Sequence, residues 1–495
     1  MTAITPHLPV LQVIVPLIGA FLAGLLRRGT SGFLLALAVS WLMPIIAGAM
    51  LYQTLTSGPI SYHLGGWEPP YGIEYRVDLF NAFVLMLVSS VGAVIMPFAR
   101  RSIAFETDAG AWFYCMYLLC LAGLLGITVT GDAFNAFVFL EISSLSTYVL
   151  IALGRDRRAL LSAFQYLIMG TIGATFYIIG VGLIYLVTGS LNMQDIAARL
   201  VDAFPTQSRP VMAALAFISV GVGLKLAMFP LHVWLPNAYA YAPSVATAFL
   251  AGTATKVAIY LLIRFFYGIF GHAIDFRALT VTALIIGLSI AAMFIASFIA
   301  VFETNLKRML AYSSVAQIGY ITLGIGLANQ NGLTGSIVHL ANHAVMKAAL
   351  FLVLGAVFFR IGSVKLHDLS GIGHRMPLTM TAFVIGGLGI IGTPGTAGFI
   401  SKWYLALGAF NEGSWPLLLV IVVSSLIAVI YIGRVVEVAW FREESPLAAT
   451  AREAPLDMLV PIMVLAAATI YFGIDTRATA SIASQVAAML LGGLR

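Results

Sequence analysis

The feature that most constrains this chain is a series of apolar runs of 18 residues or more that recurs from one end of the sequence to the other. A helix of that length crosses a hydrocarbon core of about 30 Å. Hydrophobic residues make up 61% of the 495 residues and charged residues only 9%, whereas a soluble domain carries about 25% charged residues. The sequence therefore excludes a soluble fold and predicts an all-α polytopic membrane protein.

We expect a single membrane domain over residues 1–495 with about fourteen transmembrane helices. The first span has no basic stretch before it and no small-residue cleavage site after it, so it is predicted to be a retained helix rather than a signal peptide. The predicted spans are 8–26, 32–55, 78–98, 111–130, 133–153, 160–188, 210–231, 244–268, 275–301, 307–328, 334–359, 377–411, 415–440 and 456–474.

Basic residues gather in the loops that follow odd-numbered spans, for example Arg27, Arg100 and Arg155, and are scarcer in the other loops. The positive-inside rule then places the odd loops in the cytoplasm and both termini on the periplasmic side of a bacterial inner membrane. The formal net charge of +6 is dispersed among short loops, with no basic run that could follow a phosphate backbone. No nucleic-acid partner is expected.

Two spans are interrupted by proline close to a lysine. In the seventh span Lys225 comes five residues before Pro230, and in the twelfth a Thr-Pro-Gly sequence precedes Lys402. Because the two breaks lie five spans apart, they favour a tandem repeat of a five-helix unit. Residues 111–268 and 275–440 would then form two inverted repeats, an arrangement that many transporters build around sites at the membrane midplane.

Four of the six lysines fall inside apolar spans: Lys225, Lys256, Lys347 and Lys402. A lysine at the centre of a membrane helix costs roughly 2.5 to 3.5 kcal/mol on an insertion scale, so packing alone gives no reason to keep these residues. We interpret them as functional ionisable groups. For Lys225 a structural role also stays open, because carbonyls freed by the proline break could stabilise its charge.

Other polar residues at the spans favour simpler explanations. Long cationic side chains near helix ends carry their charge to the lipid headgroups, and this snorkelling is predicted for Arg264, Arg360 and Arg434. Asp132 and Asn135 precede the fifth span, where an aspartate is more often a helix N-cap than a catalytic group.

The remaining candidates are one acid and three histidines. Glu141 is the only acidic residue near the middle of a span, and pairing with a buried lysine would let it ionise, so that the pair could gate protons. His339, His343 and Lys347 recur at i, i+4 and i+8, which places them on one side of a helix over about 12 Å. Imidazole both accepts and donates a proton and so suits a relay. His232, beside the proline break, is an accessory candidate that could equally be a hydrogen-bonded core residue.

Motifs of soluble enzymes are missing from the sequence or misplaced in it. The sequence Gly387-Leu-Gly389-Ile-Ile-Gly392 matches GxGxxG but lies inside a span, and there is no Walker A or HExxH sequence. Cys115 and Cys120 are five residues apart within one span, a spacing that suits neither a disulfide framework nor a metal motif. We therefore expect no catalytic centre, no metal ligands and no cofactor.

These residues resemble the antiporter-like membrane subunits shared by Mrp-type multisubunit cation/proton antiporters, respiratory complex I and membrane-bound hydrogenases. The resemblance covers about residues 78 to 440. The segments that carry it are GDAFNAFVFLEISSLSTY (131–148), LKLAMFPLHVWLPNAYAYAP (224–243), GTATKVAIYLLIR (252–264), NLKRMLAYSSVAQIGY (305–320), HLANHAVMKAALF (339–351) and GFISKW (398–403).

The resemblance implies fourteen helices in two inverted five-helix repeats around a polar axis of protonatable residues. Lysine at position 402, together with the lack of a long lateral helix after the last span, favours the D-type subunit of the Mrp-type antiporters. The implied roles are a gating pair for Glu141 and Lys225, a bridging lysine for Lys256, a relay for His339, His343 and Lys347, and an exit group for Lys402.

The expected function is proton translocation within a multisubunit Na⁺ or K⁺/proton antiporter, with other membrane subunits as partners. A redox-driven proton pump of the complex I or membrane-bound hydrogenase type would use the same residues and is the alternative. A third possibility is a structural scaffold that conducts nothing. It predicts that the buried lysines can be replaced by apolar residues without loss, and their insertion cost argues against it.

Overall fold

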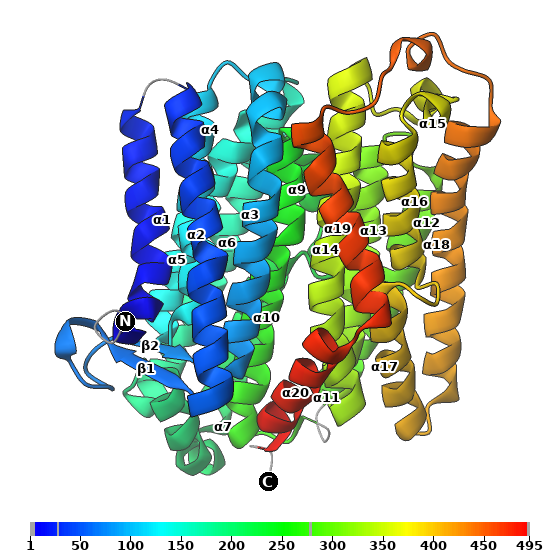
Figure 1. The fold of residues 1–495 in the computed structure, drawn as a ribbon. Coiled ribbons are helices and arrows are strands. Elements are labelled where there is room, and N and C mark those ends of the chain that lie inside the picture. Colours follow the sequence, from blue (N-terminus) through cyan, green and yellow to red (C-terminus); the bar gives the residue numbers. More distant parts are fainter. Residues whose placement is uncertain (1–4, 27–28, 277–279, 493–495) are drawn as a thin grey trace.

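The computed structural model describes residues 5–26, 29–276 and 280–492, most of them in helices that run up and down side by side (Figure 1). Within these residues thirteen helices are long and apolar enough to cross a membrane, and Pro377–Ile391 is a shorter apolar helix. Backbone polar groups in lipid need internal partners, which helices supply within one segment. The expected all-helical polytopic membrane fold is confirmed.

The helices agree closely with the predicted spans, except where a span is divided or extended. They are α1 (Leu8–Leu25), α2 (Gly29–Ser57), α3 (Leu79–Glu106), α4 (Gly110–Val129), α5 (Ala133–Ala152), α6 (Arg158–Thr188), α7 (Met193–Leu226), α8 (Leu235–Tyr241), α9 (Ser244–Gly252), α10 (Ala254–Gly268), α11 (Thr280–Ala291), α12 (Ser297–Phe302), α13 (Leu306–Leu327), α14 (Gln330–Ile361), α15 (Ile372–Arg375), α16 (Pro377–Ile391), α17 (Ala397–Asn411), α18 (Trp415–Phe441), α19 (Leu456–Ile474) and α20 (Ile482–Gly492).

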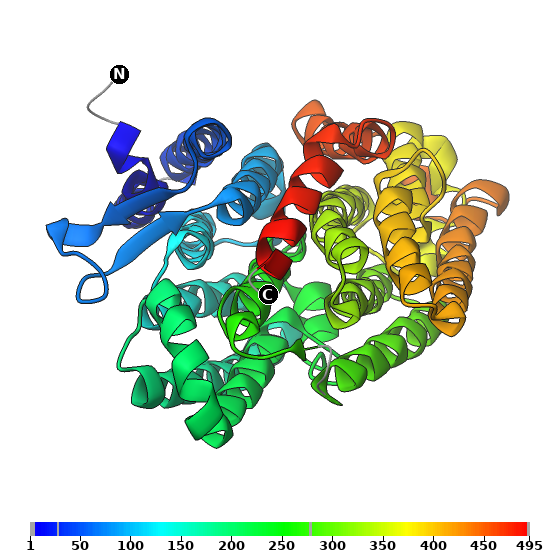
Figure 2. The ribbon, with the colours of Figure 1, turned by 90° about the horizontal axis from the view of Figure 1, so that it is seen from below.

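Seen along the helix axes, α1 to α10 fill one side of the molecule and α11 to α18 the other, while α19 and α20 lie along the boundary (Figure 2). The helix α14 packs against α9 of the first side and against α13 and α17 of the second. Almost every residue in its middle is buried. A polar side chain on α14 is therefore enclosed by protein on all sides.

The seventh and twelfth spans are broken, as predicted. The helix α7 ends where Ala227 adopts a left-handed conformation, with φ at 59°, and Pro230 follows. Between α16 and α17 the chain turns at Gly392, whose φ of 87° suits glycine and few other residues. The sequence did not indicate a third break, in which Thr253 leaves helical geometry between α9 and α10.

A short β hairpin, absent from the predicted elements, connects α2 to α3. Strands β1 (Ile60–His63) and β2 (Glu74–Val77) pair antiparallel with Ile60 opposite Val77. Asp78 follows directly and caps α3, because its side chain accepts hydrogen bonds from the backbone N–H groups of Phe80 and Asn81. The hairpin thus fixes where α3 begins.

Two helical segments extend beyond the predicted spans. The first turns of α7, up to the bend at Gln207, precede the seventh span, and Asn192 caps them by accepting hydrogen bonds from two backbone N–H groups. The short α20 follows α19 and packs against α3, α10 and α14. The start of α1 and the end of α20 lie at the same, lower end of the bundle (Figure 1).

Candidate functional site

The helix α14 carries the predicted stripe of titratable residues. His339, His343 and Lys347 are all fully buried. The two imidazole rings are parallel to within 4°, and their centroids are 5.8 Å apart. The i, i+4 spacing therefore does bring the rings face to face, as expected for one side of a helix.

His339 is hydrogen-bonded at both ring nitrogens. Its Nδ1 lies 2.7 Å from the hydroxyl of Ser401 on α17, and its Nε2 lies 3.0 Å from the side-chain oxygen of Gln317 on α13. Both partners are fully buried or nearly so. The ring is held from two neighbouring helices, and so its orientation is fixed.

His343 differs from its neighbour, because neither of its buried ring nitrogens has a hydrogen-bond partner among the described residues. An unsatisfied buried polar group costs about 1 to 3 kcal/mol, so each such group in a folded protein calls for an explanation. The neighbouring Asn342 donates to the carbonyl of Ala397, while its own side-chain oxygen has no partner among the described residues. This part of α14 therefore has ring nitrogens that are available to bind a proton or a water molecule.

Lys347 and Lys256 are held by neutral oxygen atoms. The Nζ of Lys347 donates to the carbonyl of Leu310 and to the hydroxyl of Ser313, each at 2.8 Å. Lys256, just after the break at Thr253, donates to the carbonyl of Ala251 and to the side chain of Thr255. Within the described residues neither lysine forms an ion pair with a carboxylate.

Lys402 reaches back into the break between α16 and α17. Its Nζ donates to the carbonyls of Ile390 and Ile391, at 3.0 and 2.9 Å, and to the hydroxyl of Ser425 at 2.9 Å. The last carbonyls of a helix lack intrahelical partners and carry partial negative charge, which favours a cation. The ring of Tyr320 lies 4.4 Å from the ammonium and adds a cation–π contact.

Glu141 and Lys225, the implied gating pair, are neighbours without a direct ion pair. Lys225 is buried on α7 and donates to the hydroxyl of Ser144, which lies one turn after Glu141 on α5. The two charges are close enough to attract each other. One carboxylate oxygen of Glu141 and the hydroxyl of Tyr148 are buried without a partner among the described residues, so the contact between the charges is open in this conformation.

His232 lies in the segment between α7 and α8. Its ring stacks on Phe229 at 5.2 Å and meets Tyr312 edge-on at 6.4 Å. Its Nδ1 is buried without a hydrogen-bond partner in the described part of the chain. The structure therefore places His232 beside the break, and neither ring contact is with another of the candidates.

The candidates fall into a connected group and a separate pair. Lys256, Lys347 and Lys402 are close enough to His339 for their charges to act on its ring, and Lys256 also acts on Lys347. The side chains thus converge on α14 from α10 and α17. Glu141 and Lys225 lie apart from this group, and no hydrogen bond among the described residues joins Lys225 to Lys256.

Several partners were not predicted from the sequence. Ser401 directly precedes Lys402, and Gln317 is an amide inside an apolar span, so each carried a weak signal. Ser144 and Ser425 carried none, because serine is common in helix interiors near the backbone carbonyls it can bond. The geometry adds these hydroxyls and the Gln317 amide to the candidate site.

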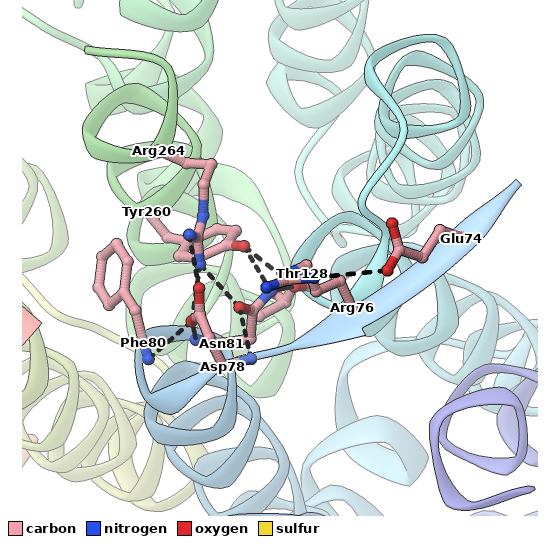
Figure 3. A network of polar contacts seen from close by, with 8 residues as sticks. All are labelled: Glu74, Arg76, Asp78, Phe80, Asn81, Thr128, Tyr260 and Arg264. Atoms are coloured by element: carbon pink, nitrogen blue, oxygen red, sulfur yellow. Dashed lines mark hydrogen bonds and ion pairs between the residues drawn. The ribbon is translucent and has the colours of Figure 1, made fainter. Parts of the chain in front are cut away.

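Arg264 corrects the prediction of snorkelling. Its side chain is 14% exposed and makes a bidentate ion pair with Asp78, at 2.7 and 2.9 Å, and a hydrogen bond to Asn81 at 2.7 Å (Figure 3). Asn81 in turn donates to the carbonyl of Thr128 and to the hydroxyl of Tyr260. We call these five residues the Asp78–Arg264 cluster. The paired charge makes a route to the headgroups unnecessary.

Asp78 lies outside the membrane-spanning segments, at the N-cap of α3. Burial alone would raise the pKa of its carboxyl, but the neighbouring Arg264 and two backbone N–H groups hold the pKa below its usual value. A cavity of about 290 Å³ opens beside the pair. The carboxylate is thus ionised, fully hydrogen-bonded and within reach of solvent.

A fifth lysine is also buried, although it stands at the very edge of a predicted span. The Nζ of Lys307, at the start of α13, donates to the hydroxyl of Ser244 at 3.0 Å. Glu106 accepts hydrogen bonds from the backbone N–H and the hydroxyl of the same serine. Ser244 therefore links Lys307 to the carboxylate of Glu106, whereas the lysines of the α14 group have no such carboxylate nearby among the described residues.

The chain is similar to known proteins over most of its length. Residues 130–428 match the family described as NADH:quinone oxidoreductase/Mrp antiporter, TM. The N subunit of the NADH-quinone oxidoreductase from Desulforudis audaxviator is 43% identical over 95% of this chain and 96% of its own length. The D subunit of the Na(+)/H(+) antiporter from Alkalihalophilus pseudofirmus is 32% identical over 98% of this chain and 97% of its own length.

Among solved structures, a chain of the Mrp complex from a Dietzia species superimposes with a TM-score of 0.90 at 27% identity, and the match covers 100% of both chains. The similarity therefore extends from end to end.

Proposed function

Because the chain belongs to the NADH:quinone oxidoreductase/Mrp antiporter transmembrane family, we propose that it is the proton-translocating subunit of a multisubunit antiporter that exchanges protons for Na⁺ or K⁺. Membership in this family makes it an antiporter-like membrane subunit of an Mrp or complex I type assembly. Its partners would be the other membrane subunits of that assembly, in a bacterial inner membrane with both termini on the periplasmic side.

The observation that carries the proposal is that Lys256, Lys347 and Lys402 have only neutral oxygen atoms as hydrogen-bond partners within the described residues. A lysine in an ion pair with a carboxylate is held in its charged form. A lysine that donates to carbonyls and hydroxyls can still donate two hydrogen bonds after it has lost one proton, because a neutral amine has two N–H groups. Such a lysine can therefore release its proton without leaving a buried carboxylate charge unpaired.

The proposed route begins at Glu141 and Lys225. Closing the gap between them would stabilise the charged lysine, and opening it would release the proton toward the interior. Lys256 would pass the charge to the stripe on α14, where the free ring nitrogens of His343 can accept or donate a proton. Lys402, at the break between α16 and α17, would be the exit group, with His232 as an accessory residue.

We further propose that residues 111–268 and 275–440 are the two inverted five-helix repeats. The break between α7 and α8 near Lys225 and the break between α16 and α17 at Lys402 support this division, since one lies in each half. Repeats of opposite orientation would give each side of the membrane its own half-channel. The helix α14 belongs to the second repeat and packs against α9 of the first.

A redox-driven proton pump is the second candidate, and the 43% identity to the N subunit of an NADH-quinone oxidoreductase favours it. The same lysines and histidines would then move protons outward, driven by electron transfer in another subunit. The two candidates differ in their energy source, and so in what starts proton movement.

The test uses the complete gene cluster in everted membrane vesicles from a strain that lacks its own antiporters. Collapse of a pH gradient on addition of Na⁺ or K⁺ is measured for wild type, Glu141→Ala, Lys225→Ala and Lys402→Ala at equal assembly. Lys365→Ala is the matched control, because Lys365 is an exposed lysine outside the helices. We expect a cation response from wild type and the control and none from the three variants.

Other outcomes have clear meanings. A gradient built by wild type from a reductant, with no cation response, replaces the antiporter with the redox pump. Variants that behave like the control would contradict the assignment of the buried charges to the proton route in either assembly.

A further inference from the structure

Ser401 occupies a junction that the family resemblance did not assign. It is fully buried in the first turns of α17, directly before Lys402. Its Oγ lies 2.7 Å from Nδ1 of His339 and 3.0 Å from the carbonyl of Gly398. The hydroxyl thus connects a histidine on α14 with the backbone at the break of the twelfth span.

A hydroxyl has a single hydrogen, so Ser401 cannot donate to His339 and to Gly398 at the same time. Gln317 removes the ambiguity at the other ring nitrogen, because its side-chain oxygen accepts from Nε2–H at 3.0 Å. In neutral His339, Nδ1 is then an acceptor and the serine donates to it. In the imidazolium, Nδ1–H donates to the serine, and the serine hydrogen turns to the carbonyl of Gly398.

We propose that Ser401 and Gln317 are positioning residues that let His339 hold a second proton and that transmit its charge state to the break beside Lys402. The inference rests on the proposed proton-translocating function. When a proton binds to Nδ1, the hydroxyl hydrogen leaves Nδ1 for the carbonyl oxygen of Gly398. No covalent bond of the serine is lost, and every donor keeps an acceptor in both states.

The carbonyl of Gly398 lies where a change in its hydrogen bonding can affect both α16 and α17. A side chain at position 398 would push its Cβ into the carbonyl oxygen of Gly389, so the backbones of α16 and α17 touch here. Lys402, in the next turn, donates to the last carbonyls of α16. A new hydrogen bond at Gly398 therefore acts on the two helix ends that hold the exit lysine.

Burial and the surrounding charges together oppose protonation of His339. Lys256 from α10, Lys347 from α14 and Lys402 from α17 all act on the ring, and no described carboxylate pairs with it. His343 stacks against it, and Tyr320 on α13 lies 5.9 Å away. Against these charges the two hydrogen-bond acceptors, Ser401 and Gln317, are what stabilises the imidazolium.

A purely structural role for Ser401 makes a different prediction. Serine often donates to a carbonyl three residues earlier in its own helix, as it does here to Gly398. In that case Ser401→Ala would lower stability slightly and leave the titration of His339 unchanged. The pH at which His339 is half protonated therefore distinguishes the two roles.

The experiment follows hydrogen–deuterium exchange at the ring carbon of His339 by mass spectrometry, as a function of pH, in the purified whole complex. The variants are Ser401→Ala, Ser401→Thr and Gln317→Glu, with Ser89→Ala as control. Ser89 is a buried serine on α3 whose hydroxyl bonds to carbonyls of its own helix. The pH dependence of proton transport is measured in parallel.

We expect Ser401→Ala to lower the titration midpoint by about one pH unit, because the charged ring loses the stronger hydrogen bond. Ser401→Thr restores the hydroxyl and should restore the midpoint, while Gln317→Glu should raise it by about one pH unit by adding a negative charge. The control should match wild type. A midpoint that is the same in wild type, Ser401→Ala and Gln317→Glu, or no titration of His339 between pH 5 and 10 in wild type, would overturn the inference.

The exchange measurement does not depend on transport. If wild type moves no protons while His339 titrates as described, the proposed function fails and the coupling of Ser401 to His339 stands. If transport depends on the buried lysines but Ser401→Ala leaves the titration midpoint of His339 unchanged, the coupling is contradicted and the proposed function stands.

Discussion

The Asp78–Arg264 cluster and the stripe on α14 are both built from buried ionisable groups, but the protein satisfies them to different degrees. In the cluster, the cation meets a carboxylate in two hydrogen bonds, and Asn81 and Tyr260 complete the network (Figure 3). On α14, His343 has no protein partner among the described residues, and Lys347 has only a carbonyl and a hydroxyl.

The difference separates two uses of buried charge. A closed ion pair fixes both protonation states and ties α3, α4 and α10 together, so it supports the frame of the molecule. Groups with neutral or missing partners can change their charge, so they suit transport. Stability and proton movement should therefore depend on different residues.

The largest effect is expected from breaking the cluster. Asp78→Ala leaves Arg264 buried without its carboxylate and should destabilise the protein by about 3 to 5 kcal/mol. The melting temperature of the purified complex measures this. The double variant Asp78→Ala, Arg264→Leu should recover part of the loss, since no charge is then left alone. If Asp78→Ala lost transport while its stability stayed unchanged, the cluster would belong to the proton route and would not be a structural ion pair.

Lys347→Met should do the opposite. It removes an insertion cost of roughly 2.5 to 3.5 kcal/mol. The two acceptors keep other partners, since Ser314 donates to the carbonyl of Leu310 and Tyr431 is hydrogen-bonded to the hydroxyl of Ser313. We expect a melting temperature close to that of wild type and at least a tenfold loss of proton transport. Full transport in this variant would remove α14 from the proposed route.

A smaller effect should distinguish two glycines in the same break. Gly392 and Gly395 have φ of 87° and 84°, so alanine at either costs about 1 to 2 kcal/mol of backbone strain. Only at Gly392 does the added Cβ meet Lys402, 2.8 Å from its Cδ, while position 395 is open. At equal assembly, Gly392→Ala should slow transport several-fold more than Gly395→Ala. Equal rates would mean that the position of Lys402 is not critical.

The smallest effect is a pH dependence of the cluster. Because the pKa of Asp78 is lowered in the folded protein, the pair stabilises it above the ordinary carboxyl pKa of about 4, and this stabilisation is lost as pH falls through the lower, folded value. The difference in melting temperature between wild type and Asp78→Asn should be constant from pH 5 to 8 and narrow only below pH 4. A difference that changes near neutral pH would contradict the assignment of a permanently ionised pair.

The sequence predicts the membrane spans well because length and hydropathy act within one helix. The cap at Asp132 is confirmed for the same reason, since its side chain accepts from the backbone N–H of Asn135 at 2.6 Å. The β hairpin escaped prediction because its strands have only four residues each, too few for their alternation of apolar and polar side chains to stand out. The break at Thr253 was missed because no proline lies near it in the sequence.

In the site, spacing along the chain predicted the stripe on α14 but not the partners of its residues. Arg264 and Asp78 are 186 positions apart, and no local pattern links them. Lys225 donates to Ser144 rather than Glu141, although both lie on one face of α5. Gly170 of α6 also lies beside this ammonium, since a Cβ there would be 3.4 Å from the lysine Nζ.

The partners of the buried lysines also bear on how such sites change during evolution. Lys256, Lys347 and Lys402 each bond to at least one main-chain carbonyl, an acceptor that every residue type supplies. Neighbouring side chains can therefore drift without removing that acceptor, as long as the helix breaks or bends at the same point. Distant relatives of this chain should be easier to identify from where their helices are interrupted than from which acids accompany their lysines.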